Sequence, residues 1–557
     1  MNKIDIEKSS GHPSMFSDFR NENWQDLKCR VEAEPLPRSV YQHFENTASA
    51  YPDKEAWHFI DTETSRTWSQ ALELVDRAAA ALHLLGAREG DHVAIMATNI
   101  EEFPTLWLAL ARIGAAMVPV NARYSPVEVD YALTTSDAKF FLIEDELCSV
   151  LEKLVHKAIP NERLIIIGGK GPSGYTRWRS LVGAATGVIS PVATPDPERV
   201  LNLQYTSGTT GFAKACMLPH SYWLICALTH HQIAATDLAR MYANTSFYYM
   251  INQRMLVQAM FSGDCLVFPK TPTTSCFIDH LVDYNLDYCT PLLGLMKQSE
   301  RDKDRAHHVR ISMSGLGDMS RGEQSAFHRR FHFPVQNIYG MTEYGVATYV
   351  PAHQIIELED TGTIGFPAPF REVRIFDENG IPVASGEHGE ICVRGTGMLK
   401  GYYGNKQATR DAFRGKYFRT GDIGWQDERD LFFLVGRSKD MVRRASENVP
   451  CVEVETALRL MPEIVEAAVI PVPDPVTEEE VKAYVQLKPG LTPENVPPEV
   501  IFAHCETRLA PFKMPRYLEY RLAFELTETF RVQKKKLKSE SDDLISGSFD
   551  REAKKWL

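Results

Sequence analysis

The feature that most constrains the fold of this 557-residue chain is an alternation of short apolar runs with amphipathic segments between residues 68 and 167. Residues 68–86 place apolar side chains at helical spacing and end on a glycine, and residues 103–114 show the same pattern. Four short apolar runs are typical of buried strands: 92–97, 116–120, 140–143 and 164–167. Strands that alternate with helices predict βαβ units and a mostly parallel sheet.

The pattern changes towards the C-terminus. Around residues 362–401, glycines and prolines separate closely spaced strands, which predicts a small β-rich subdomain. After Gly436, helical and strand patterns mix. We therefore expect an α/β protein with a large N-terminal domain (1–437) of two α/β subdomains plus the β-rich one. A smaller mobile α+β C-terminal domain (438–557) should follow.

Composition narrows the class of protein. Acidic residues outnumber basic ones by 73 to 61, and the resulting net charge of −12 argues against nucleic-acid binding. An anionic ligand would therefore need a local positive site. The ten cysteines form no Cys-x-x-Cys pair, which argues against zinc ribbons and indicates a reducing compartment. With no apolar leader and no apolar span, we expect a cytoplasmic protein without a membrane span.

The sharpest local signal is the segment Tyr205-Thr-Ser-Gly-Thr-Thr-Gly-Phe-Ala-Lys214. Its two glycines let successive backbone N–H groups converge on phosphate oxygens, and its hydroxyls and lysine supply further donors. The spacing differs from that of P-loop NTPases. From composition alone, phosphate binding and an ordinary surface loop are equally good interpretations.

Further motifs follow this loop. They are, in order, Tyr339-Gly-Met-Thr-Glu343, Thr420-Gly-Asp422, Gly436-Arg437-Ser-Lys-Asp440, Glu447-Asn-Val-Pro-x-Val-Glu453, and Pro515-Arg-Tyr517 with Lys534-Lys-Lys-Leu537. Together with the loop they resemble the adenylate-forming superfamily of acyl-CoA synthetases, luciferases and adenylation domains. Within it, the chain looks most similar to crotonobetaine/carnitine-CoA ligases and related bacterial acyl-CoA synthetases. The resemblance covers roughly residues 41–537.

The resemblance implies ATP, Mg²⁺ and coenzyme A as cofactors and assigns roles to residues. Glu343 is expected to hold Mg²⁺, because a single carboxylate commonly holds a Mg²⁺ that bridges phosphates. Asp422 and Arg437 are expected at the ribose, whose vicinal hydroxyls a carboxylate can bind. The expected catalytic set is Thr206, Lys214, Glu343 and Arg531. The expected nucleotide-binding set is Thr206, Ser207, Gly208, Thr209, Thr210, Gly211, Lys214, Tyr339, Gly340, Met341, Thr342, Asp422 and Arg437.

The implied reaction has two steps. A carboxylate attacks the α-phosphorus of ATP and expels pyrophosphate, and the thiol of coenzyme A then attacks the resulting acyl-adenylate. The first step depends mainly on charge neutralisation and positioning. In the family the small domain rotates between the steps about the residue matching Asp440, so Asp440 is the expected hinge. A homodimer is a further expectation.

Two departures from the family pattern bear on the chemistry. Arg531 stands where a lysine normally bridges the carboxylate and the α-phosphate, and the planar guanidinium is not equivalent to an ammonium. Either Arg531 serves, or Lys534 or Lys535 takes its place, although a solvated basic run over 534–536 is the favoured interpretation of these lysines. Ala445-Ser446 replaces a glycine pair beside the pantetheine channel, which would narrow it or favour another thiol.

The acid is expected to contact residues after the loop. The expected set is Tyr249, Asn252, Arg254, Gly315 and Leu316. Tyr248 and Tyr249 could cage a quaternary ammonium, or Arg254 could pair with a second carboxylate or polar group. A third interpretation is that these polar residues only face solvent or a neighbouring helix. Because a long acyl chain would disfavour such polar groups, we predict a small or polar acid.

Two other functions stay open from the sequence. A luciferase-like adenylating oxidoreductase would share the first step and then use oxygen. A nucleotide-binding homologue with impaired adenylation is motivated by Arg531 alone. The leading interpretation is an ATP-dependent, AMP-forming acid–CoA ligase.

Overall fold

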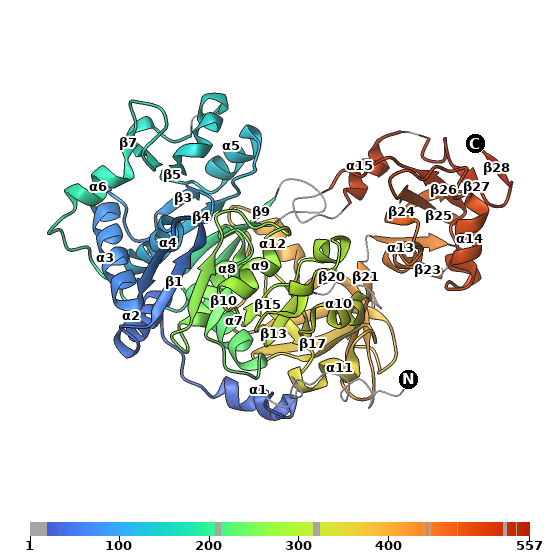
Figure 1. Ribbon diagram of the computed structural model, residues 1–557, viewed down its shortest axis with the longest axis horizontal. Helices are drawn as coiled ribbons and strands as arrows, with labels where there is room; N and C mark the ends of the chain where they lie inside the picture. Colours follow the sequence, from blue (N-terminus) through green and yellow to red (C-terminus); the bar gives the residue numbers. More distant parts are fainter. Residues whose placement is uncertain are drawn as a thin grey trace. The chain divides into compact units, whose positions relative to one another are not determined.

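The computed structural model describes residues 19–156, 158–206, 213–315, 323–437, 440–444, 447–475, 477–526, 532–541 and 543–557. The chain forms two compact units (Figure 1). The first comprises residues 1–373 and 393–418, and the second comprises residues 374–392 and 419–557. In the described ranges, no helix combines the length and the apolar character that a membrane span requires.

The first unit contains a seven-stranded sheet of order β7-β6-β5-β3-β4-β8-β9. All its neighbouring strands are parallel except the antiparallel pair β8–β9. The strands are β3 (His92–Met96), β4 (Ala116–Val120), β5 (Phe140–Glu144), β6 (Leu164–Ile167), β7 (Thr176–Arg177), β8 (Val200–Thr206) and β9 (Lys214–Pro219). The predicted parallel sheet is therefore confirmed.

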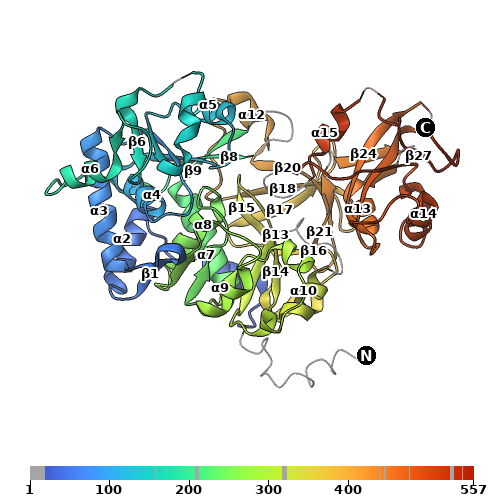
Figure 2. The ribbon, with the colours of Figure 1, turned by 45° about the horizontal axis from the view of Figure 1, so that its top comes forward.

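Helices flank this sheet on both sides (Figures 1 and 2). They are α3 (Trp68–Leu85), α4 (Glu102–Ile113), α5 (Pro126–Thr135) and α6 (Trp178–Ala184). Thr67 forms a capping box at the start of α3, and Gly86 ends the helix with a φ of 100°, a left-handed conformation that favours glycine. On one face, Val129 and Leu133 of α5 pack against strand residues such as Phe141. The helices and strands predicted between residues 68 and 167 are confirmed within one or two residues.

A second sheet of the first unit has the order β16-β15-β14-β13-β12-β10-β11-β1-β2. Its strands are β1 (Glu55–Phe59), β2 (Thr64–Thr67), β10 (Arg240–Tyr242), β11 (Cys265–Phe268), β12 (Tyr288–Cys289), β13 (Ile311–Gly315), β14 (Val335–Met341), β15 (Gly345–Tyr349) and β16 (Thr363–Pro367). The remaining helices of this unit are α1 (Trp24–Glu32), α2 (Val40–Ala50), α7 (His220–Ile233), α8 (Met250–Ala259), α9 (Phe277–Asp283), α10 (Glu323–Phe331), α11 (Ile355–Leu358) and α12 (Lys406–Asp411).

Four strands lie at or near the division between the units: β17 (Arg371–Phe376), β18 (Gly389–Gly395), β19 (Phe413–Arg414) and β20 (Tyr417–Gln426). The second unit continues with β21 (Phe432–Arg437), β22 (Met441–Arg444), β23 (Glu447–Pro450), α13 (Cys451–Arg459), β24 (Ile464–Asp474), β25 (Glu478–Leu487), α14 (Pro498–Glu506), β26 (Tyr517–Tyr520), α15 (Lys534–Ser539), β27 (Phe549–Asp550) and β28 (Lys555–Trp556). These short strands and mixed helices confirm the predicted change of pattern.

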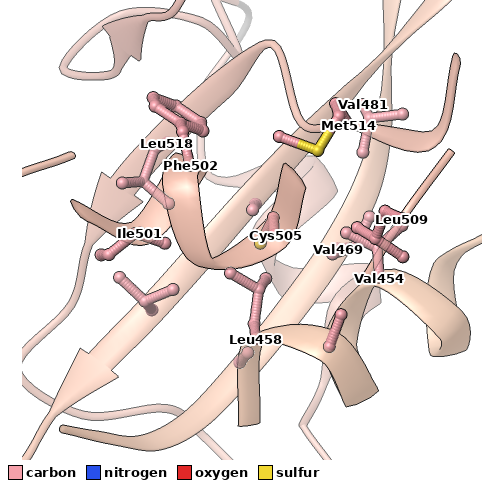
Figure 3. Packing of buried hydrophobic residues seen from close by; sticks show 14 of the residues in the cluster. Val454, Leu458, Val469, Val481, Ile501, Phe502, Cys505, Leu509, Met514 and Leu518 are labelled. Carbon is pink, nitrogen blue, oxygen red and sulfur yellow. The ribbon is translucent and has the colours of Figure 1, made fainter. Parts of the chain in front are cut away.

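Helices cover both faces of the β24–β25 sheet, because successive buried side chains of β24 point to opposite faces. Ala467 and Val469 point into a core shared with α13 and α14, and Figure 3 shows Val454, Leu458, Ile501 and other members of that core. Ala468, Ile470 and Val472 point into a second cluster that includes Leu537 of α15. Leu537 thus anchors α15 on the opposite face.

Candidate active site

The expected phosphate loop lies between two paired strands of the first unit. Thr206 ends β8, Lys214 begins β9, and the two residues are directly opposite in the antiparallel register. The hydroxyl of Thr206 lies 3.5 Å from the carbonyl oxygen of Lys214. Ser207, Gly208, Thr209, Thr210 and Gly211 lie outside the described residues. The strands therefore fix both ends of the expected loop.

The Tyr339–Glu343 motif forms the end of β14 and the turn into β15. Gly340 must be a glycine, because a Cβ there would lie 2.2 Å from the carbonyl oxygen of Gly345. Tyr339 is buried and its ring lies 6.3 Å from that of Tyr344, while Met341 and Thr342 are partly exposed. Glu343 is only 6% exposed. Because the local dielectric constant is lower than that of water, its carboxylate attracts a cation more strongly there than it would in water.

Tyr402, which was not predicted from the sequence, connects the loop to this turn. Its hydroxyl donates to Oε1 of Glu343 at 2.9 Å, and Nζ of Lys214 lies 4.9 Å from the centre of its ring. Burial, followed by the charge of Glu343, raises the pKa of Tyr402 well above its ordinary value. The structure therefore brings Lys214 and Glu343 to one tyrosine. The Gly-Tyr-Tyr-Gly stretch at 401–404 was the only sequence signal for it.

The residues expected around the acid lie at the start of α8. Tyr249 is the residue before the helix, its ring lies 4.6 Å from that of Tyr248, and its hydroxyl lies 3.4 Å from Nδ2 of Asn121. Gln204 on β8 donates to the carbonyl oxygen of Tyr248 at 2.9 Å. The two tyrosines are therefore adjacent and linked to the strand that leads into the phosphate loop.

The polar residues that follow these two tyrosines, on α8, form hydrogen bonds within the protein. Asn252 is fully buried; its amide nitrogen donates to the carbonyl oxygens of Ala243 and Thr245, and its amide oxygen accepts from the Thr245 hydroxyl. Arg254 is 4% exposed and donates to Gln258 and to the hydroxyl of Tyr288. Neither faces solvent, so the solvent-facing half of the third interpretation is wrong, whereas its other half, contact with neighbouring elements, agrees with these bonds. Packing against neighbouring elements describes both residues.

The other side of the expected acid pocket is only partly described. Gly315 is the last residue of β13 and pairs with Ile338 on β14. Leu316 lies outside the described residues. Gly315 therefore lies beside β14, the strand that contains Tyr339.

In the second unit, the two expected ribose residues lie side by side. Asp422 on β20 and Arg437 on β21 are directly opposite in the antiparallel register, and Nε of Arg437 lies 3.3 Å from Oδ1 of Asp422. Asp422 is 4% exposed, whereas the side chain of Arg437 is 40% exposed. The pair can therefore present one carboxylate and one guanidinium to the same polar ligand.

Asp440 and Lys534 also meet in the second unit. Nζ of Lys534 lies 2.7 Å from Oε1 of Glu455 and 3.9 Å from Oδ2 of Asp440. Although burial opposes the charge, the carboxylate of Glu455 keeps the pKa of Lys534 above its ordinary value. Lys534 is thus an ion-paired residue, and the prediction of a solvated lysine is wrong for it but right for the exposed Lys535 and Lys536.

Three positions on which the departures rest lie outside the described residues: Arg531, Ala445 and Ser446. Their expected effects on adenylation and on the thiol channel stay predictions.

The first unit offers a single carboxylate where the sequence predicts Mg²⁺. No group of three or more His, Cys, Asp or Glu side chains suited to a metal occurs among the residues that the structure describes. Mg²⁺ that binds with nucleotide typically takes one or two carboxylates and keeps several waters. Glu343, buried and oriented by Tyr402, fits that mode of binding.

The family of the chain follows from its match to two family models. Residues 44–403 match the AMP-binding enzyme family, and residues 453–531 match the AMP-binding enzyme C-terminal domain. The chain belongs to the AMP-binding enzyme family.

Relatives and solved structures agree with this assignment. A crotonobetaine/carnitine–CoA ligase of Salmonella typhi is 30% identical over 529 residues, which cover 90% of this chain and 99% of the relative. ATP-bound MatB from Rhodopseudomonas palustris aligns with a TM-score of 0.81 at 24% identity, covering 92% of this chain and 100% of MatB. The anthranilate CoA ligase AuaEII with anthranoyl-AMP gives 0.80 at 22% identity, covering 92% and 98%. The predicted superfamily and α/β fold are confirmed, and the chain is an AMP-forming acid–CoA ligase that uses ATP, Mg²⁺ and coenzyme A.

Proposed function

We propose that the chain activates a small or polar carboxylic acid as its adenylate and transfers the acyl group to coenzyme A. The observation that carries the adenylation site is the contact of Tyr402 with both Lys214 and Glu343. A lysine and a buried carboxylate at one point supply what ATP needs, namely a cation for phosphate oxygens and a ligand for Mg²⁺. The luciferase-like and impaired-adenylation alternatives gain no support from relatives whose names are those of CoA ligases.

The residues divide the work of the first step. Thr206, Lys214 and the loop between them bind the phosphates, and the Tyr339–Thr342 segment lies along the nucleotide. Asp422 and Arg437 hold the ribose. Glu343 would hold Mg²⁺, which would supply positive charge to the phosphate oxygens. Arg531 contacts the carboxylate and the α-phosphate. These assignments follow the family motifs; residues 207–211 and Arg531 lie outside the described residues, so the motifs alone support their roles.

In the first step, a carboxylate oxygen of the acid attacks the α-phosphorus, the bond to the bridging oxygen breaks, and pyrophosphate departs. In the second, the thiolate of coenzyme A attacks the acyl carbonyl and AMP departs. Lys214 and Arg531 stabilise negative charge that develops on the phosphate oxygens. Asp440 is the proposed hinge between a domain of residues 1–437 and a domain of residues 438–557, and its neighbour Lys534 ties it to α13.

The wall of the acid pocket supports a small or polar substrate. Tyr248 and Tyr249 lie close with their rings tilted by 56°, as two walls of an aromatic cage would, and such faces attract quaternary ammonium groups. Arg254 is already bonded to Gln258 and Tyr288, which favours the cage over a second ion pair. Asn252 and Arg254 therefore shape the wall from behind it.

We also propose a cytoplasmic location, which is supported by ten cysteines that are all free, eight of them buried. A homodimer stays a prediction, and light scattering of the purified protein tests it.

A panel of acids, incubated with ATP, Mg²⁺ and coenzyme A and analysed by mass spectrometry, tests the proposed substrate class. We expect acyl-CoA and AMP from short, polar or betaine-like acids. Comparable kcat/KM for palmitate and for short acids would overturn it.

A further inference from the structure

Two adjacent tyrosines, Tyr402 and Tyr403, donate their hydroxyls to two different carboxylates. The Tyr402 hydroxyl donates to Glu343 at 2.9 Å, and the Tyr403 hydroxyl donates to Asp137 at 2.9 Å. Among the described residues, a lysine lies over the ring of Tyr402 but not over that of Tyr403, with Nζ of Lys214 4.9 Å from the centre of the Tyr402 ring. Tyr402 therefore contacts the proposed nucleotide site, and Tyr403 makes a similar hydrogen bond elsewhere in the same unit.

The backbone holds Tyr402 firmly in this position. The chain at 400–403 runs along β9: the N–H of Met217 donates to Gly401, that of Lys400 to Met217 and that of Tyr403 to Ala215. The N–H of Tyr402 itself donates to the hydroxyl of Thr409 at 2.9 Å. These bonds fix the ring beside the first residue of β9, which is Lys214.

The chemistry of the ring suits a position between a cation and an anion. Tyr402 is 6% exposed, and a neutral phenol in that place donates a hydrogen bond to Glu343 while its π face attracts the ammonium of Lys214. No carboxylate lies within ion-pairing distance of Lys214 in the part of the chain that the structure describes. The ring therefore orients Lys214 without neutralising its charge, which stays available to a phosphate.

We propose that Tyr402 is a positioning residue that orients Glu343 towards Mg²⁺ and Lys214 towards the phosphates of ATP. This role rests on the proposed function of Glu343 and Lys214. Groups that hydrogen-bond a metal ligand fix its orientation, and their loss typically weakens metal affinity or activity about 10–100-fold. Tyr402 stands in that relation to Glu343.

The test compares Tyr402→Phe with Tyr403→Phe in the full chain. Binding of Mn²⁺, measured by electron paramagnetic resonance with a non-hydrolysable ATP analogue present, should weaken about 10-fold in Tyr402→Phe and stay unchanged in Tyr403→Phe. The KM for the acid should stay within twofold in both variants. Tyr402→Leu removes the ring as well and should also weaken binding of the ATP analogue without metal, because Lys214 loses its support.

Glu343→Gln distinguishes failure of this role from failure of the proposed site. If Glu343→Gln leaves Mn²⁺ affinity unchanged, the proposed metal site itself is wrong. If Glu343→Gln weakens Mn²⁺ binding but Tyr402→Phe binds it as the native protein does, the positioning role alone is overturned. Equal weakening in Tyr402→Phe and Tyr403→Phe would also overturn it, since that result would reflect a general loss of structure.

Discussion

Two lysines, one in each unit, show how similar residues reach different roles. Lys214 in the first unit lies over the ring of Tyr402, and Lys534 in the second forms an ion pair with Glu455 at 2.7 Å. An aromatic face attracts an ammonium but carries no net charge, whereas a carboxylate neutralises it. Lys214 is therefore suited to a phosphate ligand, and Lys534 is suited to holding the second unit together.

This contrast bears on the substitution at Arg531. A neighbouring lysine could replace the family's catalytic lysine only if its ammonium were available to the substrate. Lys534 is committed to Glu455 and lies close to Asp440. Lys534 is therefore unsuited to that role, and the two other candidates from the sequence, Arg531 and the exposed Lys535, stay predictions.

The largest effect that we expect is a difference in adenylation activity between variants of the two lysines. Lys214→Met should lower acid-dependent exchange of pyrophosphate into ATP by about 10²–10³-fold, as the loss of one charge-stabilising donor does in other enzymes. Lys534→Met, assayed well below its unfolding temperature, should exchange within a few-fold of the native rate. A loss in Lys534→Met as large as that in Lys214→Met would show that Lys534 acts on the substrate.

A second prediction concerns stability, for which Lys534 should matter more than Lys214. Lys534→Met leaves the buried carboxylate of Glu455 without its cation, which should cost about 3–5 kcal/mol and lower the unfolding temperature of the second unit by roughly 10 °C. Differential scanning calorimetry measures this shift.

Lys536→Met is the matched control for that experiment. Lys536 pairs with Glu525 on the surface, where both side chains are more than half exposed, so its loss should change stability by less than about 1 kcal/mol. Equal shifts for the two variants would contradict the role given to Lys534.

The smallest expected effect concerns a buried carboxylate that lacks such a lysine pair. Asp264 is 4% exposed and its Oδ2 has no hydrogen-bond partner in the described part of the chain. Burial, followed by the charge of Asp287, raises the pKa of Asp264 to about 8. Because the folded-state pKa is raised, the folded protein holds a proton that the unfolded chain releases, and stability falls as the pH rises towards 8.

Asp264→Asn should therefore gain stability at pH 9 by about 1–3 kcal/mol and gain much less at pH 5. Thermal unfolding followed across this pH range measures the difference. Asp411→Asn, a change of an exposed side chain on α12, should show no such pH dependence. A gain of equal size at both pH values would contradict a titrating Asp264.

Much of the fold could be predicted from the sequence because local patterns and tertiary structure agree there. The strand over Ala116–Val120 was predicted to the residue, and Gly86 marked the end of α3 because it adopts the left-handed conformation expected of it. The order of motifs likewise indicated the family. Each strand, helix end and single motif is a signal that lies within a few residues of the chain.

The features that could not be predicted depend on contacts between distant segments. Tyr402 reaches Glu343 across 59 positions, and its role follows only from the pairing of its backbone with β9. Lys534 looked like part of a solvated basic run, since nothing near it in the sequence announces Glu455. Arg254 looked available to a substrate, yet it is buried against Tyr288.

Exchange of labelled pyrophosphate into ATP by the native protein, without coenzyme A, tests whether the chain forms an acyl-adenylate. We predict exchange that requires Mg²⁺ and a small or polar carboxylic acid, because adenylation precedes any contact with the thiol. Absence of exchange across a broad panel of acids, or exchange independent of the acid, would contradict an acyl-adenylate mechanism.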